Sequence, residues 1–86
     1  MFYVTHPSNP MYYPTTVVVG RLASNVDITM LTKLGSQCGL VLECQIVNTK
    51  ISDNYILNGE VLFSSSEGAY NFVTQSYHSF RFLLKA

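Results

Sequence analysis

Apolar residues recur in two patterns along this chain, one typical of β-strands and one typical of helices. The first strong run is Val17-Val18-Val19, which ends at a glycine. Valine is branched at Cβ and packs well on a pleated surface, so this run is expected to form a buried strand. A second apolar run over residues 40–47 is irregular around Glu43, which predicts a strand with a β-bulge.

Two segments have the spacing of apolar positions that predicts a helix. Asp27 precedes the first segment and Ser65 precedes the second. Both residue types cap helices well, because their side chains accept hydrogen bonds from free backbone amides. Gly35 lies inside the first helix and is expected to weaken it by about 1 kcal/mol relative to alanine. The second helix is expected to end before a loop over residues 74–79.

Two further strands complete the predicted α+β domain. They are expected over residues 55–64 and 80–85, and Asn58-Gly59 in the former leaves a hairpin turn open as an alternative. The resulting order is strand, helix, strand, strand, helix, strand. This order builds a ferredoxin-like fold, in which a four-stranded antiparallel sheet carries two helices on one face.

The N-terminal segment differs in composition from the rest of the chain. It holds all three prolines, which rule out a helix and disfavour a central strand. We therefore assign residues 1–15 to an extended arm and residues 16–86 to the folded domain. The arm also carries Tyr12 and Tyr13, which can dock on this domain or on a partner. A disordered tail is the alternative.

Charge and size favour association with another protein. Only 12% of the 86 residues are charged, and five Lys and Arg balance five Asp and Glu. Typical domains carry about 25% charged residues. Nucleic-acid binders draw much of their affinity from cations that neutralise phosphates, so zero net charge disfavours strong nucleic-acid binding. A domain of this size buries only about 60–65% of its unfolded surface and gains stability from a partner.

The residues that catalysis and metal binding need are sparse. The only cysteines are Cys38 and Cys44, and the only histidines are His6 and His78. They do not have the spacing of a zinc site, and neither a phosphate-binding glycine loop nor a nucleophile motif is present. We expect no enzymatic activity, no cofactor and no metal. Since no apolar run approaches the ~20 residues that span a membrane, we expect no membrane contact. The two thiols are interpreted as reduced, so we expect an intracellular, cytoplasmic protein, with perinuclear granules as an alternative location.

Several short motifs occur in an order and spacing that resembles the RNA recognition motif (RRM) family. The resemblance covers residues 16–86. Residues 17–22 lie where the family has its first ribonucleoprotein motif, and residues 56–63 are similar to the second. Cys38-Gly39-x-Val41 resembles the segment in which the family ends its first helix and begins its second strand, and residues 65–69 resemble the start of its second helix. The resemblance implies a role in RNA metabolism within a ribonucleoprotein complex, with small-RNA (piRNA) processing as one setting.

The chain departs from the family at the positions that bind RNA. The family stacks bases on aromatic side chains of the central strands, and these positions fall on Val18, Asn58 and Glu60. Stacking is worth ~1–3 kcal/mol per base, and a carboxylate in mid-sheet repels phosphate. The sequence therefore predicts a protein-binding scaffold that forms a homo- or heterodimer. Another RRM domain is one candidate partner, RNA binding is weak or indirect, and no small-molecule substrate is expected.

Two sets of candidate site residues follow. The protein-binding set consists of apolar residues expected on the open face of the sheet or left over on the helical face: Val18, Val47, Leu62, Leu83, Met30, Tyr70 and Tyr77. The alternative function is a weak single-stranded RNA-binding domain that uses cations and the tyrosines of the arm: Arg21, Arg81, Lys85, Tyr12 and Tyr13.

Overall fold

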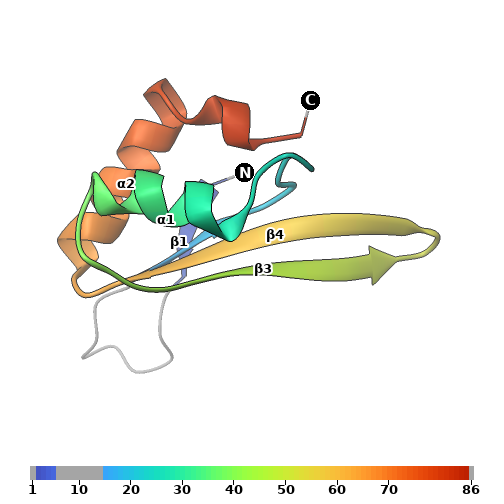
Figure 1. Ribbon diagram of the computed structural model, residues 1–86, viewed down its shortest axis with the longest axis horizontal. Helices are drawn as coiled ribbons and strands as arrows, with labels where there is room; N and C mark the ends of the chain where they lie inside the picture. Colours follow the sequence, from blue (N-terminus) through green and yellow to red (C-terminus); the bar gives the residue numbers. More distant parts are fainter. Residues whose placement is uncertain (1, 6–14, 86) are drawn as a thin grey trace.

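The fold is α+β, with two helices packed on one face of an antiparallel sheet (Figure 1). The computed structural model describes residues 2–5 and 15–85. In chain order its elements are β1 (Phe2–Thr5), β2 (Thr16–Val19), α1 (Ile28–Ser36), β3 (Val41–Ile51), β4 (Asn54–Phe63), α2 (Ser66–His78) and the 3-10 helix η1 (Arg81–Leu83). The predicted antiparallel sheet with two helices is therefore confirmed.

Three of the predicted strands lie side by side in the antiparallel sheet, in the order β2-β4-β3. The bulge predicted near Glu43 is confirmed, because the register between β3 and β4 shifts between Val41 and Glu43. The hairpin turn considered at Asn58-Gly59 is not formed, since both residues lie inside β4. The chain instead turns after Ile51, where β3 ends.

The fourth predicted strand, over residues 80–85, is wrong. Arg81–Leu83 form a 3-10 helix, and Leu84 makes only an isolated bridge with Leu22. Phe80 and Leu83 are both buried while Phe82 is exposed. A spacing of three residues between buried positions suits a helical turn, so the apparent alternation of Phe80, Phe82 and Leu84 was misleading.

β1 supplies the outer strand instead. It pairs antiparallel with β2, with Phe2 opposite Val19 and Thr5 opposite Thr16, so the full strand order is β1-β2-β4-β3. Residues 2–5 thus belong to the sheet, although the sequence suggested an arm outside regular structure. The three prolines lie outside the described residues, so they do not interrupt this strand.

Both predicted helix caps are confirmed. The Asp27 carboxylate accepts a hydrogen bond from the Met30 N–H at 2.8 Å, and the Ser65 hydroxyl accepts one from the Gly68 N–H at 3.4 Å. Gly35 has a packing role besides its helix-weakening effect. A Cβ at Gly35 would lie 2.9 Å from Val41 Cγ2, so the glycine lets α1 approach β3 closely.

The second helix is longer than predicted. It continues through residues 74–78, where the sequence suggested a loop. Ser76 is buried in this turn, and its hydroxyl donates to the Phe72 carbonyl at 2.7 Å. This local hydrogen bond satisfies a polar group that would otherwise disfavour a buried helical position.

The core lies between the sheet and the helices. Val17 and Val19 of β2 are fully buried there, as predicted. The Phe72 ring lies between those of Phe63 and Phe80, with centroid distances of 5.8 and 5.6 Å. This aromatic row links β4, α2 and the segment before η1.

Candidate functional site

The open face of the sheet has a largely polar centre. Val18, Glu60 and Gln45 are register partners across β2, β4 and β3, and the Gln45 amide donates a hydrogen bond to the Glu60 carboxylate. Val18 is only 8% exposed. Among the described residues of β2, β3 and β4, the strand alternation puts no aromatic side chain on this face, and Tyr3 of β1 is the register partner of Val18. The carboxylates of Glu43 and Glu60 give this face an acidic character.

The predicted protein-binding residues of the sheet separate into accessible and buried positions. Val47 is exposed and Leu62 is half-buried, and both are on the open face. Val18 is on the same face but is almost completely covered. Leu83 is a correction: it was expected on the open face, but it lies in η1 with an exposed fraction of 0% and belongs to the core.

The predicted residues of the helical side are also distributed unevenly. Tyr70 is exposed on α2, whereas Met30 of α1 is half-buried and packs against the core. The side chain of Tyr77 lies outside the described part of the structure. Of these three residues, Tyr70 is the one whose described side chain is exposed.

An apolar surface lies along β3, and the sequence interpretation identified only Val47 of it. Leu40 and Leu42 are exposed at its start, and Val47 and Ile51 are exposed further along it. β3 is the last strand in the sheet order, so the eleven residues of its outer edge pair with no other described strand. The signal in the sequence was the β-branched Thr49 and Ile51, which favour a strand beyond residue 47.

The distal part of the β3–β4 hairpin projects past the two helices (Figure 1). Every β3 residue from Val47 to Ile51 is exposed. At this end Lys50 and Tyr55 are register partners, and Lys50 Nζ lies 5.7 Å from the centroid of the Tyr55 ring. A two-stranded hairpin is only marginally stable by itself in water, so this half of the hairpin gains from additional contacts.

Two of the cations proposed for RNA binding lie together. Arg21 and Lys85 both line a cleft of about 510 Å³, and the Lys85 N–H donates to the Arg21 carbonyl at 2.7 Å. Arg81 lies in η1 and does not line this cleft, while Tyr12 and Tyr13 lie outside the described residues. The structure therefore brings together two of the three cations proposed for RNA binding.

The two thiols are partly buried and unpaired. Cys38 and Cys44 form no disulfide with each other, and burial raises the pKa of each thiol above its ordinary value. For Cys44 a hydrogen bond with the Thr32 side chain acts in the opposite direction on the pKa but is the smaller effect. Within residues 2–5 and 15–85, no three His, Cys, Asp or Glu side chains gather as a metal site would require.

The raised thiol pKa values predict slow alkylation of the folded chain. At pH 8 we expect iodoacetamide to modify both cysteines more slowly in the native protein than in urea, measured by mass spectrometry, because thiolate is the reactive form. Because burial raises the folded-state pKa of these thiols, their contribution to the free energy of unfolding is complete below the unfolded-state pKa. It is lost as pH rises through the folded-state pKa. Equal rates in the native and unfolded chains would contradict this prediction.

Two comparisons with known proteins found no match. The sequence matches no protein-family model, and no curated protein sequence is significantly similar to it. In the described part of the chain, neither helix has the length and apolar character needed to cross a membrane.

Proposed function

We propose that this domain is a protein–protein assembly module that pairs with a second copy of itself through the free edge of β3. The observation that carries the proposal is the long unpaired edge of β3, with Leu42, Val47 and Ile51 exposed along it. An edge strand presents a row of free backbone N–H and C=O groups, which is a template for a strand from another chain.

β3 has few of the devices that keep sheet edges from pairing. Monomeric proteins protect such edges with short strands, prolines, inward-pointing charges or a covering segment. β3 is eleven residues long and contains no proline, and Lys50 is its only cation. The bulge near Glu43 affects the proximal end, which leaves residues 44–51 in regular register with β4.

The charges of β3 are compatible with self-pairing. Two copies related by a two-fold axis would pair antiparallel, and the side chains opposite each other would lie on the same face. In the register centred on Val47, that residue meets its own copy, Gln45 meets Thr49, and Glu43 meets Ile51. Glu43 and Lys50 are the only charged residues of the strand, so no like charges face each other.

The open face of the sheet supports a protein partner more than an RNA partner. Val18, Glu60 and Gln45 form its central row, where base stacking would need aromatic rings. The carboxylates of Glu43 and Glu60 oppose phosphate. A sheet that continues from one copy into the next makes use of the edge without requiring these residues to bind nucleic acid.

The sequence resemblance adds a cellular setting to the proposal. An RRM-type domain whose described strands β2, β3 and β4 place no aromatic side chain on the open face suits a scaffold in a cytoplasmic ribonucleoprotein complex. The degenerate motifs are similar to those in the N-terminal domain of the Tudor-containing subunit of the nematode PETISCO complex. That similarity suggests piRNA precursor processing as the pathway and another domain of the same fold as a partner.

Opposite charges at position 47 test this pairing. Val47→Lys and Val47→Glu each place like charges at the two-fold axis, and we expect each to weaken self-association by about tenfold or more in sedimentation equilibrium. An equimolar mixture of the two variants is expected to associate again, because lysine then faces glutamate.

The matched controls lie on α2. Tyr70→Lys and Tyr70→Glu change an exposed residue away from β3, and they are expected to leave the association constant within about twofold of the original. Loss of association in the Tyr70 variants, or no recovery in the mixture of the Val47 variants, would overturn the proposed interface.

A further inference from the structure

The cleft beside the C-terminal segment has features of a ligand site that the proposed assembly function does not use. The β3–β4 hairpin and the loop after β2 both contribute to its walls. Its walls include Arg21, Ser24, Asn54, Tyr55 and Lys85. Its volume of about 510 Å³ lies within the range of small-molecule sites, which is about 300–1,000 Å³.

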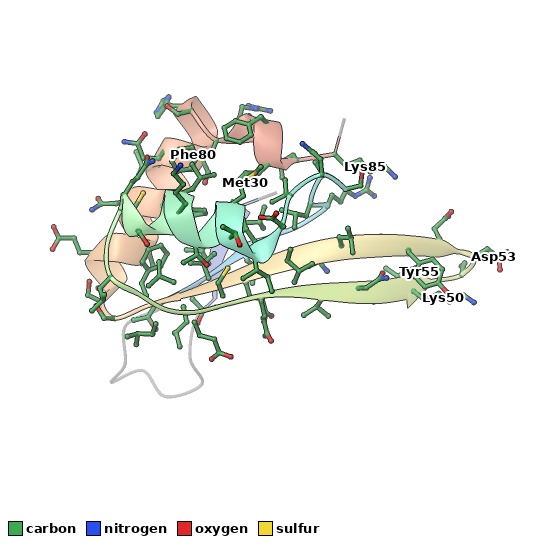
Figure 2. All side chains as sticks on the ribbon, viewed as in Figure 1. Met30, Lys50, Asp53, Tyr55, Phe80 and Lys85 are labelled. Atoms are coloured by element: carbon green, nitrogen blue, oxygen red, sulfur yellow. The ribbon has the colours of Figure 1, made fainter. Side chains whose placement is uncertain are left out.

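The cleft concentrates positive charge in a chain that is neutral overall. Arg21 and Lys85 line it, and Lys50 lies against the ring of Tyr55, so three of the five Lys and Arg are in or beside it. None of the lining residues is a carboxylate; the nearest in sequence is Asp53, which lies at the hairpin tip (Figure 2). An anion in the cleft would meet two cations without a competing negative charge in the wall.

The backbone holds Arg21 in an uncommon conformation at this site. Its φ is 57°, a left-handed value that costs energy for any residue other than glycine. The Asn58 side chain accepts a hydrogen bond from the Arg21 N–H at 3.3 Å, and the Arg21 carbonyl accepts the Lys85 N–H at 2.7 Å. These two contacts fix the backbone that carries the guanidinium and bring Lys85 beside it.

The cleft also offers a flat apolar surface. Tyr55 is 61% exposed, and Figure 2 shows it beside Lys50 near the end of the hairpin, with Lys85 on the helical side of the sheet. An exposed tyrosine ring can stack with a planar heteroaromatic ring, while Ser24 and Asn54 add hydrogen-bonding groups to the wall.

We propose that this cleft binds a nucleotide, with the phosphate held by Arg21 and Lys85 and the base stacked on Tyr55. Arginine pairs with phosphate through two parallel hydrogen bonds, and lysine adds a point charge. The ligand is either a free nucleoside monophosphate or the phosphorylated terminal nucleotide of a single strand. The site is on the side of the sheet that carries the helices, so it is separate from the open face.

Chemical-shift titration of the isotope-labelled 86-residue chain tests the proposal. Adenosine monophosphate is expected to shift the amide signals of Arg21, Ser24, Tyr55 and Lys85. Adenosine alone and inorganic phosphate alone are each expected to bind about tenfold or more weakly, because each lacks one half of the interaction. No shifts up to ~10 mM nucleotide, or equal binding of adenosine, would overturn the proposal.

Matched variants locate the two halves of the site. Arg21→Gly removes the guanidinium and accepts the left-handed backbone, and Tyr55→Leu removes the ring but keeps an apolar side chain. Each is expected to lower affinity about tenfold. Arg81→Gly and Tyr70→Leu change an exposed arginine and an exposed tyrosine elsewhere and are expected to have no effect on affinity. Equal losses in the controls would contradict the assignment.

A tetranucleotide with and without a 5′-phosphate distinguishes the two sources of the ligand. Tighter binding of the phosphorylated strand than of the monophosphate supports a strand terminus, and tighter binding of the monophosphate supports a free nucleotide. Equal binding of the strands with and without the terminal phosphate would overturn the proposed phosphate contact. Chemical-shift changes concentrated on the open face around Glu60 and Leu62 would also overturn it.

Discussion

Replacing Phe72 by alanine is expected to leave a large fraction of the chain unfolded. Phe72 has an exposed fraction of 0%, and its ring packs between those of Phe63 and Phe80. Truncation of a buried phenylalanine to alanine costs about 3–5 kcal/mol. At roughly 0.05–0.15 kcal/mol per residue, a chain of 86 residues has a total stability of about 4–13 kcal/mol, so this one change removes much of it.

Urea titration followed by circular dichroism measures the effect. Phe82→Ala is the matched control, because Phe82 is 58% exposed and its truncation is expected to cost less than about 1 kcal/mol. If the two variants lose similar amounts of stability, the aromatic row of Phe63, Phe72 and Phe80 is not the centre of the core.

Removal of residues 1–14 is expected to destabilise the domain and promote its aggregation. β1 covers the outer edge of β2 and lies against α2, so its loss removes backbone pairing and exposes a second sheet edge. With each net backbone hydrogen bond worth about 1 kcal/mol, we expect a loss of about 2–4 kcal/mol in the free energy of unfolding. The exposed edge of β2 would then attract other strands.

Two controls separate the loss of β1 from a general effect of shortening the chain. Replacement of residues 2–5 by Gly-Ser repeats keeps the chain length and is expected to destabilise the domain about as much as the truncation. A synthetic peptide of residues 1–14, added to the truncated chain, is expected to restore part of the stability. A truncated chain with the original urea midpoint would show that β1 contributes nothing.

The local signals of the sequence predicted much of the fold. Asp27 and Ser65 identify the two helix starts because capping depends on a side chain and its nearest backbone amides. Val17 and Val19 identify a buried strand because of their branched side chains. The bulge near Glu43 was visible as an interruption of strand alternation.

The outer strand could not be predicted by the same reasoning. Residues 80–85 contain alternating apolar residues, but the last turn of α2 and η1 bury Phe80 and Leu83 at helical spacing. Phe2–Thr5 form β1 through pairing with β2, a tertiary interaction that a tetrapeptide does not encode by itself. Tertiary context therefore decided which end of the chain completes the sheet.

Long-range contacts also determine which of the predicted site residues are exposed and which lie close together. Tyr70 and Val47 could be assigned to exposed positions from the periodicity of their elements. Leu83 was misplaced because its segment is not a strand. The cleft between Arg21, Tyr55 and Lys85 joins three segments far apart in the sequence, and no local pattern indicates that they meet.

Contacts between two copies across β3 give the most direct test of the assembly function. A mixture of isotope-labelled and unlabelled chain, at concentrations up to about 1 mM, allows isotope-filtered NOE measurements, which detect only intermolecular contacts. A dissociation constant of about 1 mM corresponds to a binding free energy of about 4 kcal/mol. We predict intermolecular NOEs confined to residues 42–51, with Val47 close to its own copy. A chain that stays monomeric at this concentration, or intermolecular NOEs that arise from α2 around Tyr70, would contradict the account.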